Sequence, residues 1–377
     1  MVARQAFTLI ALTLAAGCGR AQDARPPVLR AAVDLAIGSE EDGRYLFANI
    51  MGIDVDRSGR IVVADLGQKS VTLYDAAGRY LFAIGRGGAG PGEYVDGCCP
   101  RFSPTGDLWI RDMGNARHVR FALEASRAAE RGIIRMSGSN VGFRGDAAAL
   151  ADGSIIDVVP RREPNHVGLG FDLQHLSTDG RVLRTVSTRM PPDDSLAIKV
   201  VEMTQGGRQV LRYFYPPYPP LALFAMSRTG DIALAISSRY AVSLHAPDGA
   251  IRHVIRNDAA ARPSLSATER MRAQQDVKRM SDFSGGRAAF DVPERKQPVR
   301  SIQFDTAGRL WVERSVADGA EREADVYDQS GKLVEMRRWP ANVSFANGFL
   351  GTDIAVGVRT DSLGVPQVVR VRFAAVR

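Results

Sequence analysis

The sequence is poor in the residues from which disulfide frameworks and histidine metal sites are built. It has 3 cysteines and 5 histidines among 377 residues. Cys18 lies in the N-terminal segment, so only Cys98 and Cys99 remain, and these can pair only with each other or with another chain. The histidines show none of the spacings of zinc ligands. A disulfide scaffold is therefore excluded, and nothing points to a metal centre built from histidines.

Long apolar runs and blocks of basic residues are missing too. Beyond the N-terminus, no apolar run approaches the roughly 20 residues needed to span a bilayer. The formal charge is +7, but the basic residues are scattered, without a Lys/Arg block or interleaved aromatic residues. We therefore expect no nucleic-acid partner and no membrane-spanning segment in the mature chain.

Signatures of common catalytic sites are absent as well. The sequence has no nucleophile elbow, no HExxH motif and no paired-carboxylate signature. Residues 85–92 (GRGGAGPG) look at first like a phosphate-binding loop. They lack the Lys-Ser/Thr of a P-loop and a following helix, and Pro91 removes one amide donor. We interpret them as a glycine-rich crossover in which positive φ angles are needed.

The N-terminus reads as an export signal. Arg4 precedes an apolar stretch, residues 6–16, that is too short for a membrane helix. The segment Ala-Ala-Gly-Cys ending at Cys18 resembles the lipobox of bacterial lipoproteins. That resemblance implies a signal peptide over residues 1–17, a lipid anchor on Cys18, and a polar tether over residues 18–27. It also implies an outer-membrane location, facing the periplasm or the exterior, and the alternative is an ordinary cleaved signal.

Cys98 and Cys99 are neighbours in the sequence. Neighbouring side chains on a strand point to opposite faces, so a disulfide between them requires a distorted backbone. We therefore favour two small buried residues, while an oxidising compartment keeps the vicinal disulfide open as the alternative.

Internal repetition is the strongest signal. Residues 50–55, 60–65, 70–75 and 79–84 are short runs rich in β-branched and aromatic residues, separated by Asp/Ser/Gly turns. The first turn recurs as FSPTGDLW, LADGSI, MSRTGDI and FDTAGRLW, with glycines at 59, 106, 153, 230 and 308. A repeat of about 45 residues with four strands is typical of a propeller blade. The longer steps indicate insertions at about 191–220 and 262–297.

The last unit, residues 341–377, supplies strands near 343–346, 354–359 and 365–375, one short of a full blade. Residues 28–37 are left over before the first blade and can provide the missing strand. Such closure joins the chain ends and removes exposed sheet edges. We predict an all-β fold over residues 28–377, a six-bladed β-propeller closed by this N-terminal strand, with one short helical insertion.

These repeats resemble the NHL-like six-bladed β-propellers. The stretch GRGGAGPGEY at 85–94, directly after the first blade, is similar to exported bacterial propeller lipoproteins. The resemblance implies a fold and an export route, and it supplies no catalytic residue.

The two insertions fall on the same face of a propeller, where loops that vary usually carry function. The first contains Tyr213, Tyr215 and Tyr218 among prolines, which predicts a stiff, extended segment that stacks on a sugar or peptide or plugs the channel. The second contains Ser266 and Glu269 in a capping-box pattern, which predicts a helix over 267–280.

Each blade also brings a basic residue to that face in its second turn. A ring of cations favours an anionic ligand, such as a uronic-acid sugar or a carboxylated peptide. The alternative is that arginines fall there by chance. The candidates are Lys69, Arg111, Arg161 or Arg162, Arg239, Arg314 and Arg359.

Carboxylates at equivalent second-strand ends support a different hypothesis. If they converge, a calcium or zinc ion would make the protein a metal-dependent hydrolase or lactonase acting in the central funnel. Loop-starting Asp is also ordinary turn chemistry. We predict no cofactor and favour a module that binds a glycan, a peptide or a protein through the inserted face. The carboxylates are Asp65, Asp112, Asp157 and Glu313.

Overall fold

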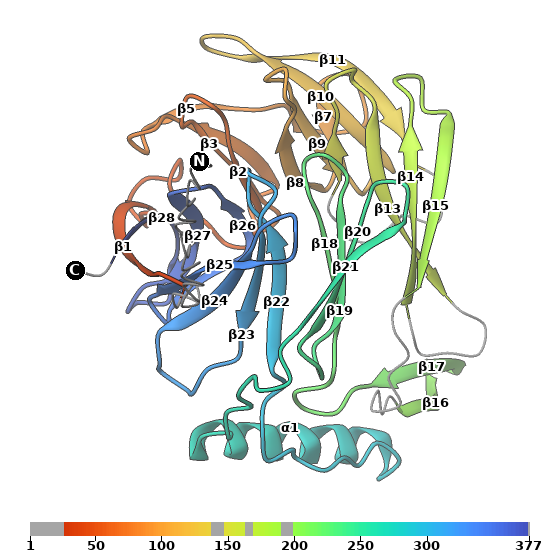
Figure 1. Ribbon diagram of the computed structural model, residues 1–377. Helices are drawn as coiled ribbons and strands as arrows, with labels where there is room; N and C mark the ends of the chain where they lie inside the picture. The colour runs from red at the N-terminus through yellow and green to blue at the C-terminus, as the bar shows by residue number, and fades with distance from the viewer. Residues whose placement is uncertain (1–25, 137–146, 163–168, 190–198, 376–377) are drawn as a thin grey trace, which may run out of the picture.

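A computed structural model describes residues 26–136, 147–162, 169–189 and 199–375. Most of these residues are in strands, and the described part contains one helix, α1 (Ala267–Ser284). The larger sheets stand side by side around a central axis, so the arrangement is propeller-like (Figure 1). No described helix is long and apolar enough to cross a membrane. The signal peptide, Cys18 and most of the predicted tether lie outside the described residues.

Four of the sheets have four antiparallel strands each. The first contains β2 (Ile50–Val55), β3 (Ile61–Asp65), β4 (Ser70–Tyr74) and β5 (Tyr80–Ala83). The second contains β8 (Gly97–Phe102), β9 (Leu108–Asp112), β10 (Arg117–Leu123) and β11 (Ala128–Arg135). The third contains β12 (Ala148–Ala149), β13 (Ile155–Arg162), β14 (Leu169–Leu176) and β15 (Val182–Arg189). The fourth contains β18 (Ala222–Met226), β19 (Ile232–Ile236), β20 (Ala241–His245) and β21 (Ile251–Arg256).

An eight-stranded sheet completes the ring, in the order β22-β23-β24-β25-β1-β28-β27-β26. Its first half contains β22 (Val299–Phe304), β23 (Leu310–Arg314), β24 (Arg322–Tyr327) and β25 (Leu333–Trp339). Its second half contains β1 (Val28–Ile37), β28 (Pro366–Ala375), β27 (Ile354–Thr360) and β26 (Val343–Leu350). The pairing of β1 with β28 confirms that the N-terminal strand completes the last unit.

Hydrophobic clusters join each sheet to the next. One contains Val62 of β3 and Leu108 of β9, and another contains Ala235 of β19 and Val312 of β23. A third joins Ile53 of β2 to Val356 of β27, which closes the circle. Burial is complete along three of the second strands, since all five residues of β3, of β9 and of β19 are buried. These strands therefore form the core between neighbouring sheets.

The recurring turn has a local cause, seen between β2 and β3. Gly59 has φ +82°, a left-handed conformation that glycine adopts at little cost. Asp56 Oδ1 accepts hydrogen bonds from the Ser58 and Arg60 amides, both at 2.9 Å. Arg60 Nε then lies 2.6 Å from Asp56 Oδ2. The repeated Asp/Ser-Gly pattern thus specifies the turn without help from the rest of the fold.

Cys98 and Cys99 form a vicinal disulfide, so the preference for two unpaired buried cysteines was wrong. The reason is a bulge in β8, where the register with β9 shifts between Cys98 and Arg101. Cys99 has φ +52°, which departs from strand geometry. The expectation of opposed side chains holds for a regular strand and fails at this bulge.

The first insertion also differs from the expected extended aromatic segment. Residues 199–214 form a hairpin of β16 (Lys199–Gln205) and β17 (Arg208–Phe214). Gly206 and Gly207 have φ +59° and +78°, as a two-residue hairpin turn requires. This Gly-Gly pair between Val-rich runs was the sequence signal that could have predicted the hairpin.

The glycine-rich crossover is held against the first sheet by a hydrogen bond. Its two short strands, β6 (Arg86–Gly87) and β7 (Glu93–Tyr94), pair in parallel. The buried Tyr94 hydroxyl accepts a hydrogen bond of 2.8 Å from the Val71 amide. Residues 85–94 therefore form the predicted crossover between the first and second sheets.

Candidate functional site

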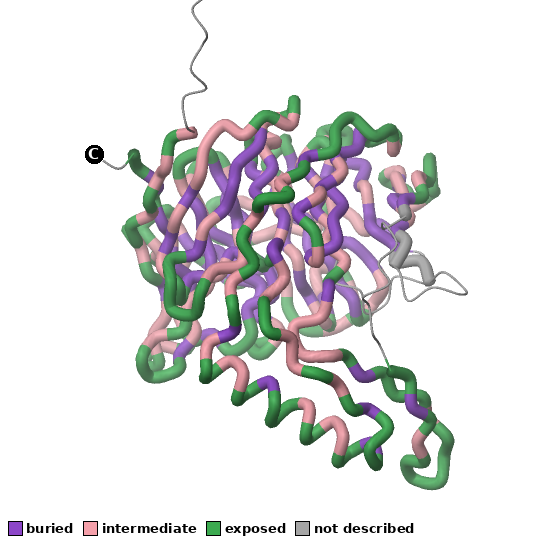
Figure 2. Tube along the Cα trace, turned by 60° about the horizontal axis from the view of Figure 1, so that its bottom comes forward, coloured by how far each residue is buried: buried purple, intermediate pink, exposed green. Residues whose placement is uncertain are grey.

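The two insertions pack together as one unit on one face of the ring. Figure 2 shows α1 and the β16–β17 hairpin next to each other at the same end of the molecule. Because the strands of each sheet alternate in direction, second turns and crossovers share this face, while first and third turns lie on the opposite one. We call the face with residues 199–221 and 257–298 the insertion face.

The helix begins as the sequence predicts and ends later. The Ser266 side chain accepts from the Glu269 amide at 3.1 Å, and Glu269 accepts in return from the Ser266 amide at 3.0 Å. This reciprocal capping box is confirmed. The helix continues to Ser284, where Gly285 has φ +64° in the left-handed region that commonly ends helices.

One side of the hairpin packs on the segment that follows α1. Val201 and Phe214 are 6% and 8% exposed and share a cluster with Ala288. Arg287 Nη1 donates to the Glu202 carbonyl at 2.9 Å, and the Phe214 ring centroid lies 6.2 Å from that of Phe283. These contacts hold a two-stranded hairpin that would be only marginally stable alone.

The other side of the hairpin is exposed and carries three apolar residues beside polar ones. Val200 faces Tyr213 across the two strands, and Glu202 faces Leu211, so these four side chains share one side. Val200, Leu211 and Tyr213 are 51%, 60% and 50% exposed. We call Val200, Leu211 and Tyr213 the hairpin patch.

The three predicted tyrosines do not form one site. Tyr213 belongs to the hairpin patch, and Tyr215, 51% exposed, follows it just beyond β17. Tyr218 is half-buried with φ +52°, and its carbonyl accepts from Gln297 Nε2 at 3.1 Å. Burial and the charges of Glu269 and Asp318 raise the pKa of its phenol. Tyr218 thus connects the two insertions.

The predicted cations lie on second strands and turns, mostly engaged by neighbouring side chains. Arg111 is buried, with Nη2 at 3.4 Å from Asp157. Arg314 Nη2 lies 2.9 Å from Glu323, and Arg359 Nε donates to Gln367 at 2.9 Å. Lys69 and Arg239 are exposed in their turns. The side chains of Arg161 and Arg162 lie outside the described part.

Two of the four predicted carboxylates hold the crossovers. Asp65 accepts from the Ala48 amide at 2.7 Å and from the Asn49 amide at 2.9 Å. Asp112 accepts from the Val95 amide at 3.0 Å, in the corresponding place of the next sheet. Asp65 therefore connects the loop before β2 to β3, and Asp112 connects the loop before β8 to β9 in the same way.

The other two carboxylates are paired with buried cations. Burial opposes ionisation of Asp157, but nearby His118 and Arg111 outweigh it and lower the pKa of this carboxyl. Glu313 Oε1 accepts from Arg322 Nε at 2.8 Å. Within the described residues, no three His, Cys, Asp or Glu gather closely enough to hold a metal ion. The hydrolase alternative stays a hypothesis, and no arrangement of these residues favours it.

A cavity of about 390 Å³ lies on the axis, between the innermost strands β2, β8, β18, β22 and β26. Arg228, from the turn after β18, extends into it toward β2: its Nη2 lies 2.5 Å from Asp54 Oδ1. Its Nη1 donates to the Phe102 carbonyl of β8 at 3.0 Å. Sequence reasoning missed both Arg228 and Asp54. The aligned turn positions hold Arg57, Pro104 and Thr306, so nothing local distinguished Arg228.

No protein-family model and no curated protein matches this chain. Among solved structures it is similar to a Bacteroides fragilis protein named as exported, at 10% identity and TM-score 0.47, covering 93% of this chain and 99% of that one. A member of the DUF4221 family from Bacteroides vulgatus gives 10% and 0.45, with 92% and 99% covered. The PQQ-bound aldose sugar dehydrogenase of Streptomyces coelicolor gives 13% and 0.44, with 93% and 100% covered. Similarities of this size carry no functional argument.

Proposed function

We propose that this protein is an exported six-bladed β-propeller of the cell envelope, anchored by a lipid on Cys18, which binds an acidic partner protein through its insertion face. The observation that carries this proposal is the hairpin patch. Its apolar side chains are at least half exposed on a hairpin whose other side is packed. A solvent-facing hairpin side normally carries mainly polar residues, so three exposed apolar residues together on one side point to a partner.

The count of six treats the two halves of the eight-stranded sheet as separate blades. Only three residue pairs, from Val28↔Met336 to Arg30↔Arg338, join β1 to β25. Each half is otherwise four antiparallel strands, like the four other large sheets. The NHL-like repeat pattern agrees with this count.

The charge of the insertion face favours an acidic partner. Residues 199–221 contain three basic residues and one acidic residue, and residues 257–298 contain eight and six. Together they carry +4 of the chain's formal +7. Complementary charge around an apolar patch speeds encounter and discourages basic surfaces from binding.

The path of β1 supports this choice of face. Leu29 pairs with Ala375, whereas Ile37 pairs with Val368 near the turn that precedes β28. That turn, residues 361–365, is a second turn and lies on the insertion face, so β1 starts at the opposite face. A tether of about ten residues reaches at most roughly 35 Å. An anchor at Cys18 would therefore leave the insertion face pointing away from the membrane.

A displayed library of random 12-residue peptides, selected against the chain from Arg20, tests this proposal. We expect the enriched peptides to combine acidic and apolar residues. Leu211→Glu should weaken their binding at least tenfold, because it places a charge in the hairpin patch. Ile251→Glu is the matched control, since Ile251 is 63% exposed on β21, outside the insertion face. It should change the affinity less than twofold.

Three results would overturn the proposal. One is a selection that yields no binder above the bare support. Another is a set of peptides without acidic residues. The third is equal binding to the Leu211→Glu and Ile251→Glu variants, which would place the binding surface elsewhere on the propeller.

A further inference from the structure

The axial cavity is separate from the hairpin patch, and its wall is formed by the innermost strands of several sheets. Four of the five innermost strands that line it are irregular. Register shifts occur in β2 at Ile50/Gly52, in β8 at Cys98/Arg101, in β22 at Val299/Ser301 and in β26 at Ser344/Phe349. Bulges re-aim side chains and are enriched beside binding sites. Here they shape the wall of one cavity from several blades.

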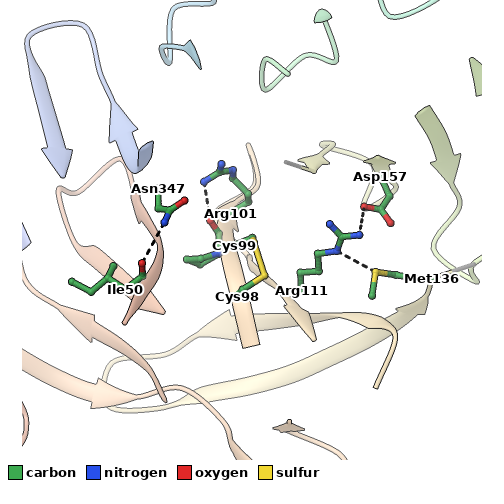
Figure 3. Close-up of a disulfide and its surroundings, with 9 residues drawn as sticks. Ile50, Cys98, Cys99, Arg101, Arg111, Met136, Asp157 and Asn347 are labelled. Atoms are coloured by element: carbon green, nitrogen blue, oxygen red, sulfur yellow. Dashed lines mark hydrogen bonds and ion pairs between the residues drawn. A yellow bond between two sulfur atoms is a disulfide. The ribbon is translucent and has the colours of Figure 1, made fainter. Parts of the chain in front are cut away.

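Side-chain hydrogen bonds hold the longest of these bulges in place. Gln303 Nε2 donates to the Phe345 carbonyl at 2.8 Å, which ties β26 to β22. Asn347 Nδ2 donates to the Ile50 carbonyl at 3.3 Å, which ties β26 to β2 (Figure 3). The cavity is therefore a built feature of the ring, with walls cross-linked between blades.

Much of the wall is aromatic or contains sulfur. Met51, Cys99, Phe224, Phe304 and Phe349 all line the cavity. Aromatic rings bind other rings by stacking or edge contacts, and polarisable sulfur also contacts aromatic rings favourably. These surfaces favour a flat ring over an aliphatic chain or a sugar.

The vicinal disulfide makes one part of this wall rigid. Cys98 is fully buried and Cys99 contributes to the lining (Figure 3). Gly52 of β2 lies directly against it, since a Cβ at that position would be 2.5 Å from Pro100 Cδ and 3.0 Å from Cys99 Cα. The disulfide bulge and β2 are thus in close contact at the wall of the cavity.

Arg228 is one of the polar groups of the wall, which also includes Arg101, Ser301, Gln303 and Asn347. Its side chain is 35% exposed, and it donates to Asp54 and to the Phe102 carbonyl. A guanidinium has five N–H donors, so further donors of Arg228 are available to a ligand. Asp54 balances its charge at 2.5 Å. A neutral acceptor suits this pair better than an anion, which would compete with Asp54.

We propose that the axial cavity binds an uncharged, flat aromatic molecule whose carbonyl oxygen accepts a hydrogen bond from Arg228. The volume of about 390 Å³ lies in the range of small-molecule pockets and accommodates two fused rings with short substituents. This site is independent of the proposed protein partner on the insertion face.

The probe for a test is 6-propionyl-2-(dimethylamino)naphthalene, an uncharged naphthalene ketone. Its emission moves to the blue in apolar surroundings and to the red when its carbonyl accepts a hydrogen bond. We expect saturable binding at one site per chain with blue-shifted emission. Ala346→Trp fills the cavity from an exposed lining position and should weaken binding at least tenfold. Ala77→Trp, in the exposed turn between the two outer strands of the first sheet and away from the cavity lining, should have no effect.

Arg228→Lys tests the hydrogen bond itself. The ammonium keeps the charge opposite Asp54 but loses the guanidinium fork. We expect three- to tenfold weaker binding and a further blue shift of the bound probe. Equal binding to the Ala346→Trp and parent chains overturns the cavity as the site. Loss of binding in Leu211→Glu assigns the probe to the hairpin patch and also overturns it, whereas failure of the peptide selection leaves this proposal standing.

Discussion

Asp54 Oδ1 and Arg228 Nη2 lie 2.5 Å apart although 174 residues separate them in the chain. The pair connects the innermost strand of the first sheet to the turn after the innermost strand of the fourth. Asp54 is almost fully buried, and its second oxygen accepts from the Phe102 amide at 2.7 Å. One carboxylate thus joins three sheets across the axis.

Replacing Asp54 by Ala should cost about 2–4 kcal/mol of unfolding free energy. The Phe102 amide loses its acceptor and Arg228 loses its counter-charge, while both stay near the axis. Urea unfolding of the variant measures this cost. The control is Asp42→Ala, whose partner Arg44 is 62% exposed, and it should cost less than about 1 kcal/mol. Equal effects of the two substitutions would contradict a structural role for the axial pair.

Tyr94 should make the protein sensitive to alkaline pH. Burial raises the pKa of its phenol to about 12, against 10 in the unfolded chain. Between these values the unfolded chain has lost the proton and the folded chain keeps it. Stability is therefore full below pH 10 and falls as pH rises toward 12, by up to about 1.4 kcal/mol per pH unit.

The Tyr94→Phe variant separates this effect from general alkaline unfolding. At pH 7 it should lose about 1–2 kcal/mol, because the buried Val71 amide has no acceptor. Between pH 10 and 12 its unfolding free energy should fall less steeply than that of the parent chain. Parallel curves would mean that Tyr94 does not titrate within this window.

Replacing Arg337 by either Lys or Ala should lower the free energy of unfolding. It is 1% exposed, and its guanidinium carbon lies 4.4 Å from the Trp311 ring centroid and 4.6 Å from that of Phe373. Lys cannot stack as a plane between two rings, so Arg337→Lys should cost about 1–2 kcal/mol, and Arg337→Ala about 3–5 kcal/mol. Thermal and urea unfolding give both values. The exposed Arg372→Ala variant should stay within about 1 kcal/mol of the parent.

Without the vicinal disulfide, the positive φ angle at position 99 should still lower the stability of any residue other than glycine there. With Cys98→Ala in both proteins, Cys99→Gly should be more stable than Cys99→Ala by about 1 kcal/mol. The reason is the φ of +52° at Cys99, which glycine adopts more easily than alanine. Urea unfolding compares the two double variants. A more stable alanine variant would show that this backbone relaxes once the sulfur bond is gone.

Sequence patterns predicted the turns and the start of the helix correctly, because contacts between residues close in the sequence determine them. Asp56 and Gly59 specify their turn through contacts within five residues, and Ser266 and Glu269 start α1 in the same way. The β16–β17 hairpin was also locally encoded by Gly206-Gly207. The prediction followed the neighbouring prolines and tyrosines instead and gave an extended segment. The N-terminal strand was predictable because the last unit lacked one strand.

The candidate sites were much less predictable. Arg111 was selected as a second-turn cation and Asp157 as a carboxylate near a second-strand end, although β13 continues beyond Asp157 to Arg162. In the fold they lie 3.4 Å apart and neutralise each other between two sheets. The spacing of the repeats indicated which strand each residue belongs to, but it did not indicate which side chain that residue contacts.

The sequence by itself determined the strands, the turns, the helix start and the strand that closes the ring, because hydrophobic alternation, glycine and capping act over a few residues. Only the tertiary structure decided that Cys98 and Cys99 are bonded and that Arg228 reaches Asp54. It also decided that Val200, Leu211 and Tyr213 remain exposed. These outcomes depend on a bulge in β8, on which sheets face one another across the axis, and on how the two insertions pack. Such irregular or long-range contacts leave no periodic trace in the chain.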